Sequence, residues 1–554
     1  MNSSSHRITV GELAARFLEQ CGVKIAFGVI SIHNMPILDA ISRRGRIRFI
    51  SSRGEAGACN MADAAARISS TLGAFVTSTG TGAGNAAGAL VEAMTAGTPV
   101  LHLTGQIESA YLDRDLGYIH EHPDQLGMLG AVGKGAFRIR EPQTALSTLR
   151  EAARLALTPP CGPVSIEIPI DIQKMLLEMP AALSPLPPML PIADPTGVAA
   201  MASRLAVARR PLLWLGGGAR GAADAVSRFV DMGWGVVTSV QGRGVVAEDH
   251  PSTLGAFNLQ KPLEAFYNSV DAFLVVGSRL RSNETLAYEL HLPQPLYRID
   301  ADALAEGRAY PSQMFLHGDS RATLHALADQ LEGRMRIDPD FLHDLAVTRR
   351  EAEQEVDSAM GPYLSLKSTL NKLLKGDGWW VRDITLSNTI WGNRSLRLNH
   401  SRAGVHALGG GIGQGLAMGI GVALADQEHH LGRKTVVLAG DGGFMLNVGE
   451  LACAVQEKAD LLVVLMNDRA YGVIRNIQDA HYGGRHCYVD LHTPDFAAFC
   501  PSLQAGYFHL DDPACAEAVL AEALGRKGPV IVEVDMAAWG PFSAKFAGPP
   551  TKPA

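Results

Sequence analysis

The chain has 554 residues, of which 47% are hydrophobic and 19% are charged, and its formal net charge is −7. These proportions exclude a disordered or fibrous protein, and the length predicts about three domains of ordinary size. The negative net charge argues against nucleic acid or an anionic membrane as a partner.

The seven cysteines include no Cys-x-x-Cys pair, which predicts reduced thiols and no zinc site. Residues 1–7 lack the apolar segment of a signal peptide, and no uncharged apolar run is long enough to span a membrane. We therefore expect a cytoplasmic protein with no membrane partner.

Residues 1–178 alternate amphipathic and short apolar segments. Their pattern predicts a helix over residues 10–18 and strands over residues 24–29, 48–51, 73–78 and 100–104. Such alternation is typical of a doubly wound parallel sheet covered by helices. Prolines then gather between residues 179 and 195, which predicts an extended linker.

A second α/β unit is predicted over residues 196–333. Its strand at 211–215 leads into Gly216-Gly217-Gly218-Ala219-Arg220-Gly221, which matches the Gly-x-Gly-x-x-Gly pattern of dinucleotide-binding turns. An FAD- or NAD-dependent oxidoreductase is therefore the alternative function. The next strand, 234–238, ends on Ser239-Val240-Gln241, with no acidic residue to bind a ribose hydroxyl. A plain strand-to-helix turn is favoured, and FAD is not favoured as a cofactor.

The third unit, over residues 360–554, follows a charged helix predicted around 349–355 and begins with a strand at 379–383. Two further strands, 434–439 and 461–466, end on Gly440-Asp441 and on Asn467-Asp468, and a crossover helix is predicted between them at 446–455. Because parallel strands end at the same edge of a sheet, the two aspartates should lie together. Hard oxygen ligands beside glycine turns suit a Mg²⁺ ion that carries a diphosphate. Residues 540–554 should be irregular.

The segment from Gly440-Asp441-Gly442-Gly443 to Asn467-Asp468 resembles the thiamin-diphosphate fingerprint of the acetolactate synthase, pyruvate oxidase and benzaldehyde lyase family. The resemblance covers nearly the whole chain. It implies an α/β protein of three doubly wound parallel-sheet domains: a pyrimidine-binding domain (1–178), a central Rossmann-like domain (196–333) and a diphosphate-binding domain (360–554).

The same resemblance implies thiamin diphosphate and Mg²⁺ as cofactors. Asp441, Asp468 and the main-chain carbonyl of Ala470 would hold the metal ion. Many relatives carry Asn where this chain has Asp468, and either side chain offers a hard oxygen ligand.

Glu55 follows the predicted strand at 48–51, precedes a run of small residues, and matches the catalytic glutamate of the family. A buried carboxyl that donates a hydrogen bond to the pyrimidine ring would favour the imino tautomer of the cofactor, and burial would keep that carboxyl protonated. Taken alone, Glu55 could equally be a capping or surface residue.

Glycine-rich segments supply the other cofactor contacts that the resemblance implies. Small residues there let a flat ring approach the main chain closely. Ile412 stands where relatives place the side chain that wedges the thiazolium ring against the pyrimidine, although a lone isoleucine could equally belong to the core. The full predicted set is Gly82, Asn85, Gly411, Ile412, Gly440, Gly442, Gly443, Tyr471 and Gly472.

Two histidines are the predicted substrate-site residues, alongside Glu55. His33 stands where benzaldehyde lyase carries a site histidine, and His120 stands at the position of a site glutamine in both groups. Two imidazoles near the thiazolium ring could relay protons near neutral pH, or either could be a hydrogen-bonded structural residue. The predicted activity is the cleavage or formation of a carbon–carbon bond of a 2-oxo acid or 2-hydroxy ketone by a decarboxylase, lyase or carboligase.

The resemblance also predicts self-association. The unit with Glu55 should face the metal-binding unit of a second chain, so we expect a homodimer or a dimer of dimers. Ile477 stands where acetolactate synthases place a Trp of the second-substrate pocket, which argues against branched-chain synthesis. A catalytically silent scaffold would lack the catalytic carboxylate, and Glu55 is present.

Overall fold

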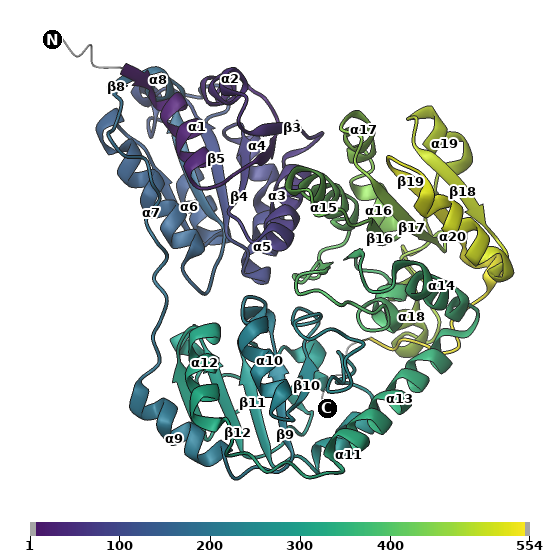
Figure 1. Ribbon diagram of the computed structural model, residues 1–554. Coiled ribbons are helices and arrows are strands. Elements are labelled where there is room, and N and C mark those ends of the chain that lie inside the picture. Colours follow the sequence, from purple (N-terminus) through teal and green to yellow (C-terminus); the bar gives the residue numbers. More distant parts are fainter. Residues whose placement is uncertain (1–6, 549–554) are drawn as a thin grey trace.

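The computed structural model describes residues 7–548, which fold into three α/β units (Figure 1). Each unit is built around its own parallel sheet, and helices lie on both faces of each sheet. The predicted fold class is confirmed, and the short apolar runs of the sequence are its central strands, since parallel strands are buried on both faces.

The first unit contains a six-stranded parallel sheet of order β3-β2-β4-β5-β7-β6, and a small antiparallel pair, β1 and β8. Its strands are β1 (Arg7–Thr9), β2 (Ile25–Gly28), β3 (Arg48–Ser51), β4 (Gly73–Thr77), β5 (Val100–Gln106), β6 (Gly135–Arg138), β7 (Val164–Pro169) and β8 (Leu176–Glu178). Its helices are α1 (Val10–Gln20), α2 (Met35–Arg44), α3 (Glu55–Ser69), α4 (Thr81–Asn85), α5 (Ala87–Ala96), α6 (Gln125–Val132), α7 (Ala145–Leu157) and α8 (Ile170–Lys174).

The second unit contains a five-stranded parallel sheet of order β10-β9-β11-β12-β13. Its strands are β9 (Pro211–Leu215), β10 (Gly235–Thr238), β11 (Ala272–Val276), β12 (Leu296–Asp300) and β13 (Met314–His317). Its helices are α9 (Pro195–Leu205), α10 (Ala223–Asp231), α11 (Lys261–Tyr267) and α12 (Ser320–Leu331), and α13 (Phe341–Met360) leads to the third unit. Residues 179–194 form neither helix nor strand, as the prolines predict.

The third unit contains a six-stranded parallel sheet of order β15-β14-β16-β17-β19-β18. Its strands are β14 (Trp379–Arg382), β15 (Gly404–His406), β16 (Thr435–Gly440), β17 (Leu461–Asn467), β18 (Gly506–Leu510) and β19 (Val530–Asp535). Its helices are α14 (Leu364–Leu374), α15 (Gly415–His429), α16 (Asp441–Leu446), α17 (Glu450–Gln456), α18 (Gly472–His481), α19 (Phe496–Ser502), α20 (Ala516–Gly525) and α21 (Met536–Trp539).

The predicted crossover helix at 446–455 is wrong in its bounds, because the crossover consists of two helices, α16 and α17. Helix α16 begins at Asp441 itself. Between the helices, the Asn447 side chain donates a hydrogen bond to the carbonyl of Gly413, at 2.6 Å. Asparagine is a weak helix former because its side chain competes for hydrogen bonds outside the helix. Here the helix breaks where Asn447 binds a loop 34 positions away in the sequence.

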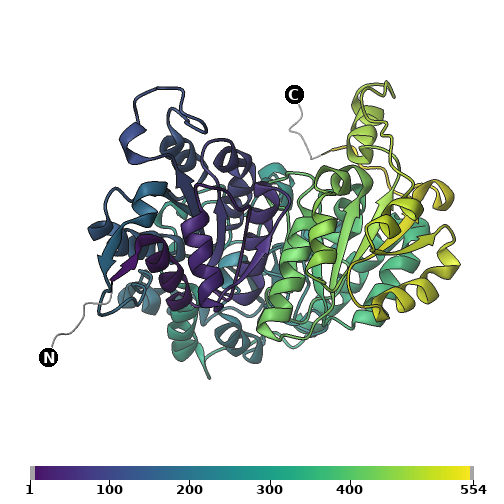
Figure 2. The same ribbon diagram turned by 90° about the horizontal axis from the view of Figure 1, so that it is seen from above.

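The first and third units lie side by side, with α3 packed against α15 (Figures 1 and 2). The two helices approach so closely that a Cβ atom at Gly421 would lie 2.3 Å from the carbonyl oxygen of Met61. Only glycine fits there, and its place on α15 lets helix α3, which begins at Glu55, lie directly on the third unit.

Within residues 7–548, no helix is both long and apolar enough to cross a bilayer. Residues 540–548 form no helix or strand, as predicted. The predictions for residues 1–6 and 549–554 lie outside the described residues.

Candidate active site

Two aspartates follow neighbouring strands of the third sheet. Gly440, the last residue of β16, pairs in register with Met466 of β17, so Asp441 and Asp468 leave the sheet at the same edge. Asp441 is fully buried, and neither of its carboxylate oxygens has a hydrogen-bond partner. Because buried polar atoms are nearly always paired, these free lone pairs are suited to a bound cation.

The electrostatics of this pair favour a cation as well. Burial, and then the charge of Asp468, raises the pKa of Asp441 from 3.8 to about 7, and burial also raises the pKa of Asp468. Ionising both buried carboxylates therefore costs free energy, and a divalent cation would offset that cost by balancing their negative charge. Glycine is required nearby, since a Cβ atom at Gly472 would lie 2.1 Å from Oδ2 of Asp468.

Few other side chains could complete a metal site here. Within the part of the chain that the structure describes, no cluster of three or more His, Cys, Asp or Glu side chains could hold a metal ion. A cation beside Asp441 and Asp468 would therefore need main-chain, water or ligand oxygens, as Mg²⁺ commonly does. Ala470, the predicted main-chain ligand, lies two residues after Asp468 and forms an isolated bridge with Asp490.

In the metal-free chain, we expect Asp441→Asn to raise the free energy of unfolding more at pH 8 than at pH 5, by roughly 1–2 kcal/mol. The native carboxyl has a raised pKa of about 7 against 3.8 when unfolded, so its contribution to stability falls as the pH rises between those values. Asparagine does not titrate and removes this dependence. Urea unfolding in EDTA at both pH values measures the difference, and an equal gain at both would contradict the assignment.

Asp383 is a site residue that the sequence analysis missed. It follows β14 at the same sheet edge, is fully buried, and accepts hydrogen bonds from the main-chain N–H groups of Gly413 (3.0 Å) and Gly415 (3.1 Å). Burial raises its pKa to about 6. Its signal in the sequence was an acidic residue directly after an apolar strand, the same signal that identified Asp441.

The loop between β15 and α15 carries two predicted cofactor residues, Gly411 and Ile412. The Ile412 side chain is 39% exposed, so it does not belong to the core of this chain. Gly413, with a φ of +87°, lies where a Cβ atom would be 2.7 Å from Cβ of Leu446. The loop therefore lies against α16 and the Asp441 turn, and presents an apolar side chain beside them.

Three predicted residues of the first unit come together at the start of α3. Glu55 is the first residue of this helix, and Nδ2 of Asn85 donates a hydrogen bond to its Oε2 at 3.1 Å. A Cβ atom at Gly82 would lie 3.0 Å from Oε1 of Glu55. The predicted burial of Glu55 is not provided by one chain, because its side chain is only partly buried. Within residues 7–548, no hydrogen bond joins Glu55 to Asp441 or Asp468.

The two predicted histidines form a pair. Their ring centroids are 5.1 Å apart in an edge-on arrangement, and His33 is buried with no partner at Nδ1. Burial, and then the charge of His120, lowers the pKa of His33 below 6.5. His120 has a φ of +68°, and its carbonyl lies so close to Gly80 that a Cβ there would be 2.5 Å away. The turn at Gly80 and the segment with His120 therefore pack closely against one another.

A buried polar network beneath these groups was also missed. Gln125 accepts hydrogen bonds from the N–H of Gly80 (2.7 Å) and the hydroxyl of Thr79 (2.9 Å), and donates to Glu167 (2.9 Å). Glu167 in turn binds Arg138. These contacts join residues 29 to 46 positions apart, so no local sequence pattern could have revealed them.

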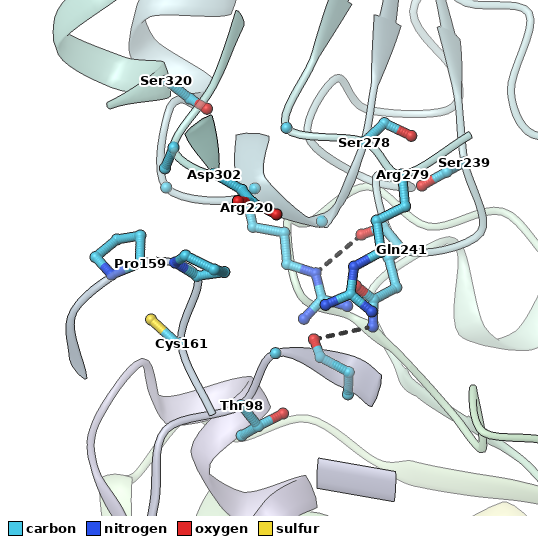
Figure 3. A pocket seen from close by; sticks show the side chains of 18 of the residues that line it. Thr98, Pro159, Cys161, Arg220, Ser239, Gln241, Ser278, Arg279, Asp302 and Ser320 are labelled. Carbon is cyan, nitrogen blue, oxygen red and sulfur yellow. Dashed lines mark hydrogen bonds between the residues drawn. The ribbon is translucent and has the colours of Figure 1, made fainter. Parts of the chain in front are cut away.

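A cavity of about 410 Å³ lies between the first and second units, away from these residues (Figure 3). The Gly-x-Gly-x-x-Gly turn lines it, and Arg220 lies beside Gln241, to whose carbonyl it donates a hydrogen bond at 2.9 Å. Arg279 points into the same space, and Asp302 lines it. The alternative oxidoreductase function would place its cofactor here.

Three family models match the chain, and all describe thiamine pyrophosphate enzymes. The N-terminal TPP binding domain matches residues 8–128, the central domain residues 198–327, and the C-terminal TPP binding domain residues 387–534.

Curated relatives match along nearly the full chain. A probable 2-ketoarginine decarboxylase of Pseudomonas aeruginosa is 30% identical over 95% of this chain and 94% of its own. The acetolactate synthase isozyme 1 large subunit of Escherichia coli is 26% identical over 96% of this chain and 94% of its own. A probable acetolactate synthase large subunit of Methanocaldococcus jannaschii is 25% identical over 94% and 91%.

Proposed function

Because the chain belongs to the thiamine pyrophosphate enzyme family, we propose that Glu55, Asp441 and Asp468 are the principal residues of its cofactor site. The enzyme uses thiamin diphosphate to cleave or form carbon–carbon bonds of 2-oxo acids or 2-hydroxy ketones. The alternative of an FAD- or NAD-dependent oxidoreductase gains no support, since the central unit also matches a thiamine pyrophosphate enzyme domain.

The metal ion of this site is Mg²⁺, held by Asp441, Asp468 and the main-chain carbonyl of Ala470. The observation that carries this proposal is the buried Asp441 carboxylate with two unpartnered oxygens beside a second raised-pKa carboxylate. These three groups would bind the ion, and diphosphate and water would supply its remaining oxygen ligands. Gly440, Gly442, Gly443 and Gly472 are the proposed diphosphate contacts beside them. A Cβ atom at Gly442, Gly443 or Gly472 would lie 2.1–3.0 Å from a protein atom, so the turns around the two aspartates need glycine.

Glu55 acts at the other end of the cofactor, where it holds a proton for the pyrimidine ring. That role needs a buried, protonated carboxyl, and one chain leaves Glu55 partly exposed. A second copy whose metal-binding unit covers Glu55 would supply the burial, which supports a homodimer or a dimer of dimers. We place this enzyme in the cytoplasm.

Thiamin diphosphate, when bound, would supply a carbon nucleophile and a cationic ring that accepts the electron pair left on the carbonyl carbon of the substrate. The residues of this chain hold and move the protons around it. His33 and His120, whose rings touch edge-on, are placed to pass a proton between substrate and solvent. Since the pKa of His33 is lowered, its ring is neutral at pH 7 and can accept that proton.

We expect the acid limb of the kcat profile to lie below pH 6.5, because protonation of His33 removes the acceptor. His120→Gln removes the neighbouring charge that lowers the pKa of His33, so this variant should move the acid limb toward higher pH. His33→Asn should lower kcat by about 100-fold and abolish the limb. A pH profile of kcat for the three proteins measures this, and a limb unchanged in both variants would show that neither ring takes part.

A substrate panel tests the activity itself. Pyruvate, branched and aromatic 2-oxo acids, 2-oxo acids with a cationic side chain, and benzoin are offered with and without thiamin diphosphate and Mg²⁺. Release of CO₂ with aldehyde products indicates a decarboxylase, ketol products a carboligase, and cleavage of benzoin a lyase. Turnover that is independent of both cofactors would contradict the proposal.

A further inference from the structure

Two buried carboxylates join the first and third units. One belongs to the third unit and binds the main chain of the first, and the other belongs to the first unit and binds the main chain of the third. Glu450, the first residue of α17, accepts hydrogen bonds from the main-chain N–H groups of Arg53 and Gly54, each at 3.0 Å. Glu92, on α5, accepts them from the N–H groups of Leu408 (2.7 Å) and Gly409 (2.5 Å). The two carboxylates are only 2% and 1% exposed. Each unit therefore fixes a main-chain segment of the other.

Each fixed segment lies within three positions before a residue of the proposed cofactor site. Gly54 precedes Glu55, and Gly409 stands three residues before Ile412. The fit is close on both sides. A Cβ atom at Gly57 would lie 2.2 Å from Oε1 of Glu450, and one at Gly409 would lie 2.8 Å from Oε2 of Glu92. Neither carboxylate can shift without moving the segment that it holds.

Helix α3 connects the two contacts. At its C-terminal end Arg67 binds Glu92 at 3.0 Å, pairs with Asp63, and donates a hydrogen bond to the carbonyl of His406 at 2.7 Å. At its N-terminal end Gly54 has no side chain to cap the helix, and the carboxylate of Glu450 approaches there instead. The helix that begins at Glu55 is thus attached to the third unit at both ends.

We propose that Glu450 and Glu92 are reciprocal positioning residues of the cofactor site. Glu450 orients Glu55, and Glu92 fixes the loop that carries Gly411 and Ile412. This inference rests on the cofactor roles proposed above for Glu55 and Ile412. Such residues matter because a displacement of about 1 Å at a reacting group can cost about 100-fold in rate.

The two carboxylates share their oxygens differently among the N–H donors, so a glutamine substitution should affect them to different degrees. Oε1 of Glu450 accepts from both N–H groups at 3.0 Å, and Oε2 accepts a second contact from that of Arg53 at 3.1 Å. A glutamine whose carbonyl oxygen takes the place of Oε1 would therefore keep one hydrogen bond to each donor. Glu92 uses one oxygen for Leu408 and the other for Gly409. A glutamine at position 92 would turn its NH₂ group toward one of these donors. Glu450→Gln should therefore be mild and Glu92→Gln severe, although the chemical change is the same.

The experiment compares full-length Glu450→Gln, Glu450→Ala and Glu92→Gln with a matched control, Glu248→Gln. Glu248 is also buried, binds Arg243 and accepts a hydrogen bond from the N–H of Leu398 at 2.9 Å, but no proposed cofactor residue follows that contact. Hydrogen exchange of peptides covering residues 53–57 and 408–413, the Kd of thiamin diphosphate with Mg²⁺, and kcat are measured on each.

Glu450→Ala should speed exchange at 53–57 and lower kcat by about 100-fold, with Kd changed by less than about 3-fold. Glu450→Gln should retain kcat within about 10-fold. Glu92→Gln should speed exchange at 408–413 and raise Kd by about 10-fold or more. In a double variant with Glu55→Gln, Glu450→Ala should not lower kcat further, because its effect on kcat acts through Glu55. The control should change neither segment.

The proposal is overturned if Glu450→Ala leaves both kcat and hydrogen exchange at residues 53–57 unchanged. It is also overturned if Glu248→Gln produces the changes that are expected of Glu450→Ala. Where a glutamate variant does not fold, Gly57→Ala and Gly409→Ala displace the same carboxylates from the other side. Full activity of Glu55→Gln would instead reject the cofactor role of Glu55, and the exchange results would still report whether the carboxylates fix their segments.

Discussion

Glu55→Gln is expected to lower turnover by about 1000-fold while the fold and the affinity for thiamin diphosphate change little. A carboxyl group can lend its proton to a ring nitrogen and take it back, whereas an amide cannot. The side chain keeps its size and its contact with Asn85, so the start of α3 should stay intact. Single-turnover rates, thermal unfolding and calorimetric titration with thiamin diphosphate measure the three quantities.

Glu12→Gln is the matched control for this substitution. Glu12 also lies in the first turn of a helix of the first unit, where it pairs with Arg16 at 2.7 Å, but it lies on α1 and was never a candidate for the site. Its variant should keep full turnover. If Glu55→Gln retains full activity, Glu55 is only a helix-terminal residue and the catalytic acid lies elsewhere.

The central strands could be predicted because they are short apolar runs that end abruptly on glycine or a polar residue. Strands β4, β16 and β17 were each predicted to within one or two residues. The crossover after β16 could not be predicted as two helices, because the break depends on a contact between Asn447 and Gly413 in another loop. Hydrophobic periodicity indicates which face of a helix or strand is buried, and it does not indicate contacts with a distant loop.

Candidate site residues could be named from the sequence where single residues end strands or begin helices, as at Asp441, Asp468 and Glu55. The site was not predictable where pairs distant in the sequence meet. Glu92 and the N–H of Leu408 are 316 positions apart, and no sequence pattern around either residue predicts their contact. The burial of Glu55 is a different case, because one chain leaves it partly exposed and the second copy that we propose would cover it.

Asp441→Ala should weaken the binding of thiamin diphosphate in the presence of Mg²⁺ by roughly 100-fold or more, since the metal ion loses a charged ligand. Asp468→Asn should cost less, because asparagine keeps one hard oxygen ligand at this position. Calorimetric titration with Mg²⁺ and thiamin diphosphate measures both. Asp535→Asn is the control, since Asp535 lies at the same sheet edge but caps α21.

The pH dependence separates a metal ligand from a structural aspartate. A cation that binds Asp441 must displace the proton held there by a pKa of about 7, so the apparent affinity for Mg²⁺ should fall as the pH drops below 7. Asp535→Asn should keep this dependence, and Asp441→Ala should lose it together with the affinity. If Asp441→Ala binds thiamin diphosphate with the Mg²⁺ and pH dependence of the unaltered chain, the two aspartates do not hold the metal ion, and the unpartnered oxygens of Asp441 need another explanation.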